Sequence, residues 1–403
     1  MSSLPKRNLT LLFWVHFFGT ISFLQPVLTL FYMEKGLSEA NILVILMSWS
    51  GAVLVGEIPT GVFADRFGAR ISFLTGSVIK LCSIGILLLA NSLEMFMLFS
   101  VLNGLSVTFF SGADEALIYE SLKVDNNQNK MDEAMGKIQS AGFIAMMIAV
   151  LFGSFFARDL EHEQFQLLIL LSMGAYFVEL VLLYFIQEPS GKVSISGTSF
   201  ENVLEGIQVI KRAPQLFVMF LNLTLVFIPT VAVFQKFDQP LMISAGLPIY
   251  FIGPIYAVGA LLAFFSSRSI GMLNKKISYS VLMYTSGFFS SLGLLLAAFF
   301  QDELWIILFV VLFLRWIGAI RYPIYSQLSN NIIPSHIRAT TISLLSILDS
   351  VFDMAIFLLL IVFAIDGING ILIGASLIAF IGSALPIPKQ SKRTKMGTSP
   401  INR

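Results

Sequence analysis

The sequence predicts an all-α membrane protein with twelve transmembrane helices arranged in two pseudo-symmetric halves of six. Three observations carry this prediction: an apolar composition, twelve apolar runs of membrane-spanning length, and a polar segment in the middle of the chain. Hydrophobic residues occupy 56% of the 403 positions and charged residues 12%, about half the charged fraction of a soluble domain. With a mean hydropathy of +0.84, the chain is expected to lie in a lipid bilayer.

Each predicted span is an apolar run of about 20 residues, the length that crosses the hydrocarbon core as a helix. The first run follows Lys6 and Arg7 but is longer than the apolar region of a signal peptide and lacks a small-residue cleavage site, so we expect an uncleaved span. The segments between runs are too short for a folded soluble domain. The twelve runs are 9–32, 41–64, 71–90, 95–118, 138–157, 167–186, 214–235, 248–268, 279–300, 305–327, 341–364 and 370–386.

The distribution of Lys and Arg predicts the orientation of the helices. If the N-terminus is cytoplasmic, the basic residues outside the spans gather in cytoplasmic segments, and only Lys35, Arg158 and Lys236 face the other way. Positively charged loops stay in the cytoplasm when a membrane protein inserts. We therefore expect a multi-pass protein of the plasma (inner) membrane with both termini in the cytoplasm.

The longest polar segment, residues 187–215, lies between spans six and seven and divides the chain. We predict a first half at 1–190, a cytoplasmic linker with an amphipathic helix at 191–213, and a second half with a cytoplasmic tail at 214–403. The stretches GLSEANILVILMSWSGAVL (36–54) and GLPIYFIGPIYAVGALL (246–262) align with a two-residue gap, each running into an even-numbered span. Such duplicated halves are the usual architecture of secondary transporters, whose solute site lies between the halves near the bilayer midplane.

The turn between spans two and three, GVFADRFGAR (61–70), concentrates charge between two apolar runs. Gly61 removes a side chain where span two would approach another helix closely. Asp65 follows the last turn of span two, where a carboxylate opposes the helix dipole, so it should seek a positive partner elsewhere. Gly68 supplies turn geometry, and Arg66 and Arg70 can reach nearby acids or lipid phosphates.

The pattern Gly-x-x-x-Asp-Arg-x-Gly-x-Arg in this turn resembles the signature loop of the major facilitator superfamily, and the layout of all twelve spans is similar to that family's. The resemblance implies that Asp65 docks on the start of helix eleven and that Glu120, at the end of helix four, completes a charge relay. The segment SHIRATTISLL (335–345) resembles the family's segment after span ten and keeps Arg338. These residues would latch the two halves together on the cytoplasmic side.

Two positions depart from the family's pattern. Ala69 stands where the signature loop usually has the first of two basic residues, which puts that part of the relay in doubt. In the counterpart segment of the first half, NKMDEAMGKIQ (129–139), Met131 stands where the family often has Arg.

Ionisable side chains inside the spans are the main candidates for function, because each costs several kcal/mol to place there. Spans two, three and six contain one ionisable side chain each, and spans four, ten and eleven contain two each. They are Glu57, Lys80, Asp114, Glu115, Glu179, Arg315, Arg321, Asp349 and Asp353.

The charges of spans ten and eleven fall at matching depths. At about 1.5 Å rise per residue, Arg315 and Asp353 lie roughly 15 Å from the external ends of their helices, and Arg321 and Asp349 lie deeper. Six residues turn a helix through about 120°, whereas Asp349 and Asp353 share one face, so both pairs cannot form equally well. We expect one Arg to pair with span eleven and the other to point into the cavity or toward the first half.

The family resemblance implies that helices one, four, seven and ten surround the cavity and that two, five, eight and eleven line the interface between the halves. Arg315 is then the best candidate for binding solute. Asp353 is the best candidate for a proton site, because a carboxylate in a low-dielectric environment can titrate near neutrality. A permanent structural ion pair is the alternative.

The remaining charged candidates have simpler alternatives as well. Asp114 and Glu115, opposite Arg321, could close an internal gate or emerge into water. Lys80 and Glu179 lie on helices that the resemblance directs away from the cavity, so we expect them to form a structural pair. Gln25 beside Pro26, and Asn222 near Pro229, place polar groups and helix breaks in spans one and seven, either facing a cavity or joining helices.

The chain lacks a phosphate-binding loop, a zinc-ligand pair and a nucleophile elbow, so we expect neither an enzyme nor an ATP-driven pump. A membrane enzyme should show converging His, Asp or Ser residues near one membrane face, and a sensor should carry a soluble domain; neither is visible. A formal net charge of +1 offers no field for nucleic acid. We expect no cofactor beyond a proton gradient, and a small-molecule solute, protons and the lipid bilayer as partners of a monomer.

The resemblance therefore implies a secondary active transporter that works by alternating access and is coupled to protons. A general resemblance to bacterial efflux carriers favours export. Against it, span five lacks the Gly-rich, Pro-containing pattern of many drug and proton antiporters, and Ser100 lies near the place in span four where a basic residue is common. Uptake by symport is the alternative, for which Arg315 would suit a carboxylate-bearing solute.

Overall fold

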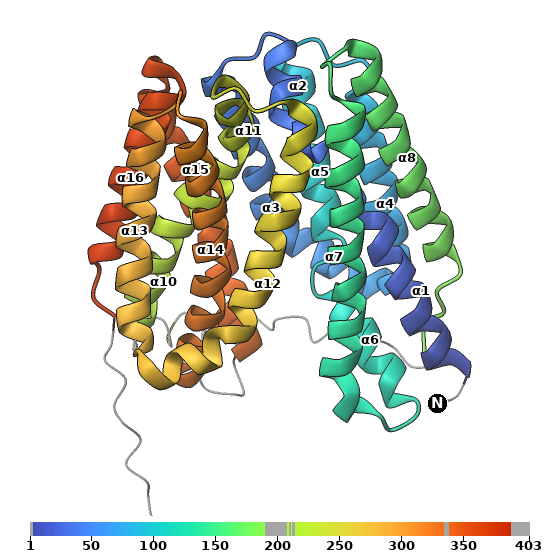
Figure 1. Ribbon diagram of the computed structural model, residues 1–403. Coiled ribbons are helices and arrows are strands. Elements are labelled where there is room, and N and C mark those ends of the chain that lie inside the picture. Colours follow the sequence, from blue (N-terminus) through green and yellow to red (C-terminus); the bar gives the residue numbers. More distant parts are fainter. Residues whose placement is uncertain (1–2, 190–207, 209–210, 212–213, 334–337, 388–403) are drawn as a thin grey trace, which may run out of the picture.

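The computed structural model describes residues 3–189, 208, 211, 214–333 and 338–387; the side chains of 3, 267–276, 330–332, 338–340 and 342–343 are outside this description. The regular secondary structure in these residues is helical (Figure 1). Helices suit a chain with apolar side chains on every face, because they satisfy their own backbone hydrogen bonds within a bilayer. In the described residues, 11 stretches are long and apolar enough to cross a membrane, and the last, Leu344–Ala384, contains two helices. The fold is therefore consistent with twelve crossings.

The first six crossings use seven α-helices of ordinary length and one short one. The first crossing is interrupted between its two helices, and the fourth is interrupted at residues 109–112. In chain order the elements are α1 (Ser3–Thr20), α2 (Leu28–Glu34), α3 (Glu39–Phe67), α4 (Ala69–Ile86), α5 (Leu93–Thr108), α6 (Ala113–Lys123), α7 (Met131–Phe156) and α8 (His162–Tyr184).

The second six crossings follow the undescribed linker region, where the predicted amphipathic helix lies. The seventh crossing contains a π-helical turn, Ile228–Val233, beside Pro229. In chain order the elements are α10 (Pro214–Phe227), α11 (Phe234–Ser244), α12 (Ile252–Lys276), α13 (Tyr279–Phe299), α14 (Leu304–Ile332), α15 (Arg338–Phe363) and α16 (Gly367–Ala384).

Local sequence explains where several of these helices begin and end. Ser38 accepts a hydrogen bond from the backbone N–H of Asn41 and caps α3, and Ser278 caps α13 in the same way. Gly68 joins α3 to α4 with φ of 90°, a conformation that favours glycine.

The seventh crossing differs from the prediction. The sequence predicts an end at residue 235, with Lys236 in an external loop, but α11 continues to Ser244 and the crossing runs from Pro214 to Ser244. Charged residues usually mark the end of a span, and here they do not. Asp238 is fully buried yet paired with Arg315, so its charge is compensated inside the protein.

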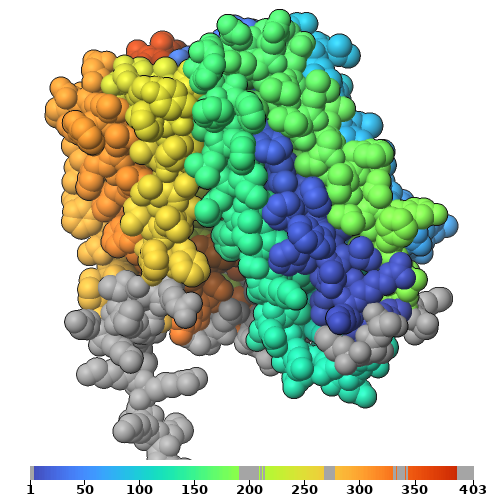
Figure 2. Space-filling model, turned by 45° about the vertical axis from the view of Figure 1, so that its right-hand side comes forward, coloured from blue at the N-terminus to red at the C-terminus, as the bar shows by residue number. Residues whose placement is uncertain are grey.

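The helices form two groups, α1 to α8 and α10 to α16, which approach one another at one end of the molecule (Figure 1). We call the face where α1 begins, at the bottom of Figure 1, the terminal face, and the other the distal face. Near the distal face, α2 packs on α11, and α7 packs on α12 beside the close approach of Gly253 to Val150. Figure 2 shows α7 and α12 side by side on this surface.

The buried apolar residues show the same asymmetry. Toward the distal face they form one continuous cluster to which both groups of helices contribute, including Phe31, Phe165, Phe237 and Leu360. Toward the terminal face the second group has its own cluster and the first group has another. The structure is therefore closed between the halves at the distal face and separated at the terminal face.

Candidate solute-binding cavity

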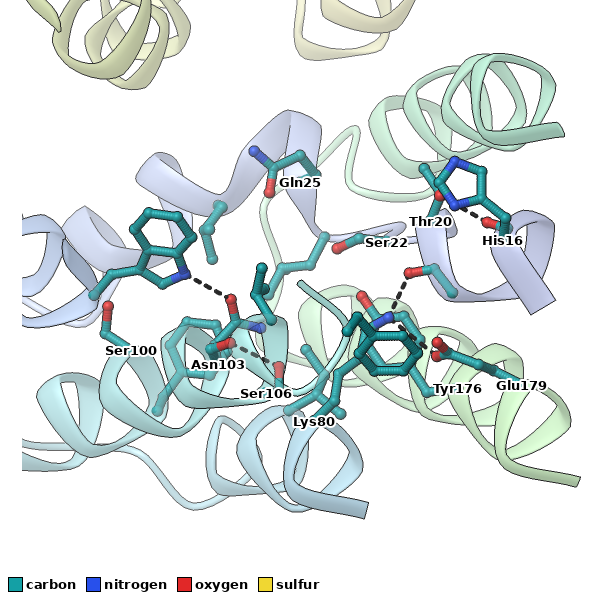
Figure 3. Close-up of a pocket in the computed structure, with 18 of the residues that line it drawn as sticks. His16, Thr20, Ser22, Gln25, Lys80, Ser100, Asn103, Ser106, Tyr176 and Glu179 are labelled. Atoms are coloured by element: carbon teal, nitrogen blue, oxygen red, sulfur yellow. Dashed lines mark hydrogen bonds and ion pairs between the residues drawn. The ribbon is translucent and has the colours of Figure 1, made fainter. Parts of the chain in front are cut away.

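A cavity of about 730 Å³ lies between the two groups of helices, within the range of small-molecule sites. The first group supplies most of its wall, and the second group supplies Ala232, Lys236, Asp353 and Phe357. The wall contains the aromatic rings of Tyr32, Trp49, Phe73, Phe99, Phe110 and Tyr176 and the polar groups of His16, Thr20, Ser22, Gln25, Asn103, Ser106 and Gln139. Figure 3 shows several of these polar side chains and Tyr176.

Asp353 lies in the cavity wall at the interface between the halves. Its Oδ2 atom accepts a hydrogen bond of 3.0 Å from the hydroxyl of Ser50, which α3 contributes from the first group. Its neighbour one turn away, Asp349, accepts a hydrogen bond of 2.8 Å from Thr224 on α10. Neither carboxylate forms an ion pair with a cation in the described part of the chain.

Lys80 and Glu179 lie together, and they lie in the cavity wall (Figure 3). The Lys80 ammonium is 3.0 Å from Glu179 Oε2, donates a hydrogen bond of 2.6 Å to the carbonyl of Gly19, and sits 4.2 Å from the centre of the Tyr176 ring. Their expected position away from the cavity is wrong. The side chains of α4 and α8 reach the cavity beside Gly19, close to the end of α1 at Thr20, and residues 21–24 that follow are not helical.

Gly19 makes room for this pair. A Cβ atom at that position would lie 2.5 Å from Glu179 Oε1, a separation that real Cβ contacts do not reach. Gly19 is also one of the last residues of α1, whose final carbonyl groups lack helical partners. The Lys80 ammonium therefore satisfies a helix end and a buried carboxylate at once.

Arg315 pairs with the seventh crossing and not with the eleventh, so the expected Arg and Asp pairing between spans ten and eleven is wrong for this residue. Its guanidinium lies 2.7 Å from Asp238 Oδ2 and 4.0 Å from the Tyr256 ring centre, and the Tyr256 hydroxyl donates to Asp238 Oδ1 at 2.5 Å. Arg315 is not among the residues that line the cavity. The partner was missed because Asp238 had been placed outside span seven.

Arg321 does not pair with span eleven either. It is 1% exposed, and its guanidinium donates to the carbonyl of Met283, the hydroxyl of Ser286, and the backbone and side-chain oxygens of Asn222. Asn222, fully buried, in turn donates to the carbonyl of Gly382. The two residues join α10, α13, α14 and α16, so Asn222 serves helix packing and does not face the cavity.

The acidic pair in the fourth crossing separates in the structure. Asp114 lines the cavity and accepts a hydrogen bond of 2.8 Å from the backbone N–H of Glu115, in the first turn of α6. Glu115 is exposed. Arg321, the gate partner considered for them, directs its donors at α10 and α13 instead, so no such gate contact exists in this conformation.

The turn between α3 and α4 has partners that the sequence analysis did not identify. Glu188, after the end of α8, accepts a hydrogen bond of 2.9 Å from the backbone N–H of Arg70, and the Arg70 guanidinium donates to the carbonyl of Tyr184 at 2.5 Å. A Cβ at Gly68 would lie 2.2 Å from Glu188 Oε1. Glu188 therefore caps the N-terminus of α4, where a carboxylate is favourable.

The latch residues themselves are not engaged with one another. Asp65 is exposed and has no hydrogen bond or ion pair with a described residue, and Arg66 stacks over Phe67. Glu120 pairs with Lys123 at 3.3 Å. The side chain of Arg338 is outside the described residues. The latch was expected for a molecule closed at the terminal face, and this structure is separated there, so the latch stays a prediction.

Gly61 of the same turn has no close neighbour in this conformation. A Cβ at Gly61 would meet no atom within 4 Å, so the close approach of another helix expected here is not formed in this conformation.

Two residues of α11 that were not predicted contribute to the site. The Gln239 side chain accepts a hydrogen bond of 3.0 Å from the backbone N–H of Thr29 and donates one of 3.1 Å to the carbonyl of Gln25, which ties the two halves together near the distal face. Lys236, one turn earlier, lines the cavity. The sequence signal was a helical spacing of Lys236 and Gln239 beyond an apolar run, which was taken for a loop.

Comparisons with known proteins agree with this architecture. A family model described as Major Facilitator Superfamily matches residues 9–355. The solved structure of the nucleoside transporter NupG is 13% identical with a TM-score of 0.73, over 95% of this chain and 97% of that chain. A bacterial homolog of the human lysosomal transporter Spinster, in an inward-facing and occupied conformation, is 15% identical with a TM-score of 0.70, over 94% of each chain.

A D-xylose-proton symporter is 16% identical with a TM-score of 0.66, over 95% of this chain and 96% of that chain. At these identities the likeness shows the fold alone. No curated protein sequence matches the chain at a significant level.

Proposed function

This chain belongs to the Major Facilitator Superfamily and is a secondary active transporter, and we propose that it moves a small organic solute through the central cavity in exchange for, or together with, protons. The proposed proton coupling rests on the environment of the Asp353 carboxylate. It is a carboxylate without a cation partner among the described residues, it lines the cavity, and its hydrogen bond to Ser50 crosses the interface between the halves.

Protonation of Asp353 would change the balance between the two conformations. In the present conformation the packing of α3 on α15 partly buries this carboxylate, which makes its charged form less favourable than it would be in water. A neutral Asp353 therefore favours closure at the distal face, and an ionised Asp353 favours separation there. A proton that binds only one conformation well shifts the equilibrium toward it, which is the requirement for coupling.

The orientation of the molecule follows the distribution of basic residues. With the terminal face in the cytoplasm of a plasma (inner) membrane protein, the present conformation is open to the inside. Asp65 would then engage the start of α15 only when the terminal face closes, in the outward-facing conformation. The latch would stabilise that state without taking part in this one.

For the direction of transport we propose export, on the resemblance to bacterial efflux carriers. Uptake by symport is the second candidate. It is supported by the cationic side chain of Lys236 in the cavity wall, which suits a solute that carries a carboxylate.

Proton movement in inverted membrane vesicles tests the proposal. Vesicles with an acidic interior are given cationic drugs, organic acids and sugars while a pH-sensitive dye reports the internal pH. A compound that releases protons from vesicles of the wild-type protein, but not from vesicles of Asp353→Asn, identifies proton antiport. Proton entry into vesicles only when solute flows inward would instead assign symport, and solute transport that is equal with and without a pH gradient would refute proton coupling.

A further inference from the structure

We propose that the transported solute is an organic anion with a carboxylate or a similar group, and that Lys236 binds this group with help from the side-chain amide of Gln25. This inference rests on the proposed transport through the central cavity and names the solute class of that site.

Lys236 is the lysine of the cavity wall whose ammonium is available to bind a solute. Of the two lysines that line the cavity, Lys80 has its ammonium occupied by Glu179, by the carbonyl of Gly19 and by the Tyr176 ring. Lys236 forms no hydrogen bond and no ion pair with a described residue. The nearest acid in its own helix, Asp238, is already bonded to Arg315 and Tyr256. A positive charge in a largely apolar cavity, whose acidic neighbour Asp238 is already bonded to other groups, is a site for an anion.

Gln25 and Lys236 both line the cavity, and Gln239 joins the elements that carry them. Lys236 and Gln239 are three residues apart on α11 and therefore share a face. Gln239 donates to the carbonyl of Gln25 at 3.1 Å, so residue 25 packs against the face of α11 that carries Lys236. The Gln25 side chain is exposed, points into the cavity and has no partner among the described residues (Figure 3). Its amide can donate a second hydrogen bond to a carboxylate.

The surroundings define the rest of the solute. Trp49 has its ring held by a hydrogen bond of 3.2 Å to Asn103, and Tyr32 and Phe357 also line this part of the cavity. Flat apolar walls of this kind bind an apolar or aromatic body. The solute is therefore an anion with one charged end and a hydrophobic body.

The carboxylates of the cavity do not oppose an anion at this position. Glu179 is neutralised by Lys80. Asp114 lies in the first turn of α6, toward the terminal face. Asp353 is the proposed proton carrier, and in its protonated form it adds no negative charge.

The local potential at Lys236 can be measured without knowing the solute. Ala232 lines the cavity one turn from Lys236, so a thiol introduced by Ala232→Cys reports the field of the lysine. Cys82 is the only cysteine of the chain, and Cys82→Ser gives a background without other thiols. The purified full-length protein is treated with an anionic methanethiosulfonate (ethylsulfonate) and a cationic one (ethyltrimethylammonium), and the ratio of the two rates is recorded.

We expect the anionic reagent to be favoured, and Lys236→Met to lower the ratio of anionic to cationic rates roughly tenfold or more. Lys236→Arg should keep the ratio, and the matched control Lys137→Met, an exposed lysine of α7, should not change it. A ratio that Lys236→Met leaves unchanged would overturn the anion site. This assay needs neither turnover nor a proton gradient, so it can succeed or fail independently of proton coupling.

The solute class is tested by protection of the same thiol from a neutral reagent, methyl methanethiosulfonate. Benzoate, 3-phenylpropionate and octanoate are each compared with the corresponding amide and amine. We expect carboxylates to slow labelling several-fold where their amides and amines do not, and Lys236→Met to abolish that protection while Lys236→Arg retains it. The assignment would be overturned if amides or amines protected the thiol as well as the carboxylates do, or if none of the carboxylates protected it.

Discussion

The pair of Lys80 and Glu179 gives a prediction whose size can be worked out from the structure. Lys80→Met removes one ion pair of 3.0 Å and one hydrogen bond of 2.6 Å to the Gly19 carbonyl. It leaves Glu179, which is 3% exposed, as a buried carboxylate without a cation. Breaking one side of a buried ion pair costs about 3–5 kcal/mol.

The lower end of this range applies to Lys80→Met, since the lysine side chain is 16% exposed and the cavity admits water. About 3 kcal/mol should lower the melting temperature by roughly 3–6 °C in a chain of this length. Thermal unfolding of the purified protein in detergent, followed by the loss of the helical circular dichroism signal, measures this shift.

A double-mutant cycle separates the pair from its surroundings. Glu179→Gln keeps the shape of the side chain and removes its charge, so Lys80→Met combined with Glu179→Gln should be less destabilised than Lys80→Met alone, with a coupling of about 2 kcal/mol. Lys137→Met, on the surface of α7, is the matched control and should leave the melting temperature unchanged. Strictly additive effects of Lys80→Met and Glu179→Gln would show that the two charges do not stabilise each other.

Three further predictions concern the contacts between and within the halves. Gln239→Leu removes two hydrogen bonds across the distal face and should shift the conformational equilibrium by about 1–3 kcal/mol toward opening at that face. The shift should appear as longer distances between spin labels attached at Glu34→Cys and Ser244→Cys in a Cys82→Ser background. An unchanged distance distribution would refute the role of Gln239. Gly253→Ala would place a Cβ 2.2 Å from the Val150 carbonyl and should lengthen the same distances, whereas Gly174→Ala, where a Cβ meets no atom within 4 Å, should not. Arg315→Met strands the fully buried Asp238 and should destabilise the protein by about 3–5 kcal/mol in thermal unfolding, an effect that Asp238→Asn in the same chain should largely reverse; loss of stability that persists in the double variant would contradict the pairing.

The fold was accessible from the sequence because its signal is long and redundant. Apolar runs of membrane-spanning length, the signature turn around Asp65 and the division near residue 190 each point to the same architecture. Helix ends were less accessible. The seventh crossing was ended at its first charge, although Asp238 is compensated by Arg315 from another helix, and a partner so distant in sequence leaves no local signal.

The candidate site was predicted only in part for the same reason. Depth along a helix directed attention to Asp353, which lines the cavity, and its role as a proton site stays a prediction. Depth cannot give the rotation of a helix or the choice among partners, so one of Arg315 and Arg321 was expected to pair with span eleven, whereas both bond to other helices. Lys80 and Glu179 lie in the cavity wall against Gly19 of the first crossing, and no pattern in α4 or α8 signals a contact with that helix.

Solute exchange compared with gradient-driven transport tests the central claim, that Asp353 couples solute movement to protons. Proteoliposomes containing the wild-type protein or Asp353→Asn are loaded with a solute found in the vesicle screen, and both radiolabelled exchange without a pH gradient and net transport driven by a pH gradient are recorded. The account predicts that Asp353→Asn retains exchange, because the cavity is intact, and loses gradient-driven transport, because no proton is carried. Gradient-driven transport by Asp353→Asn at the wild-type rate would contradict it.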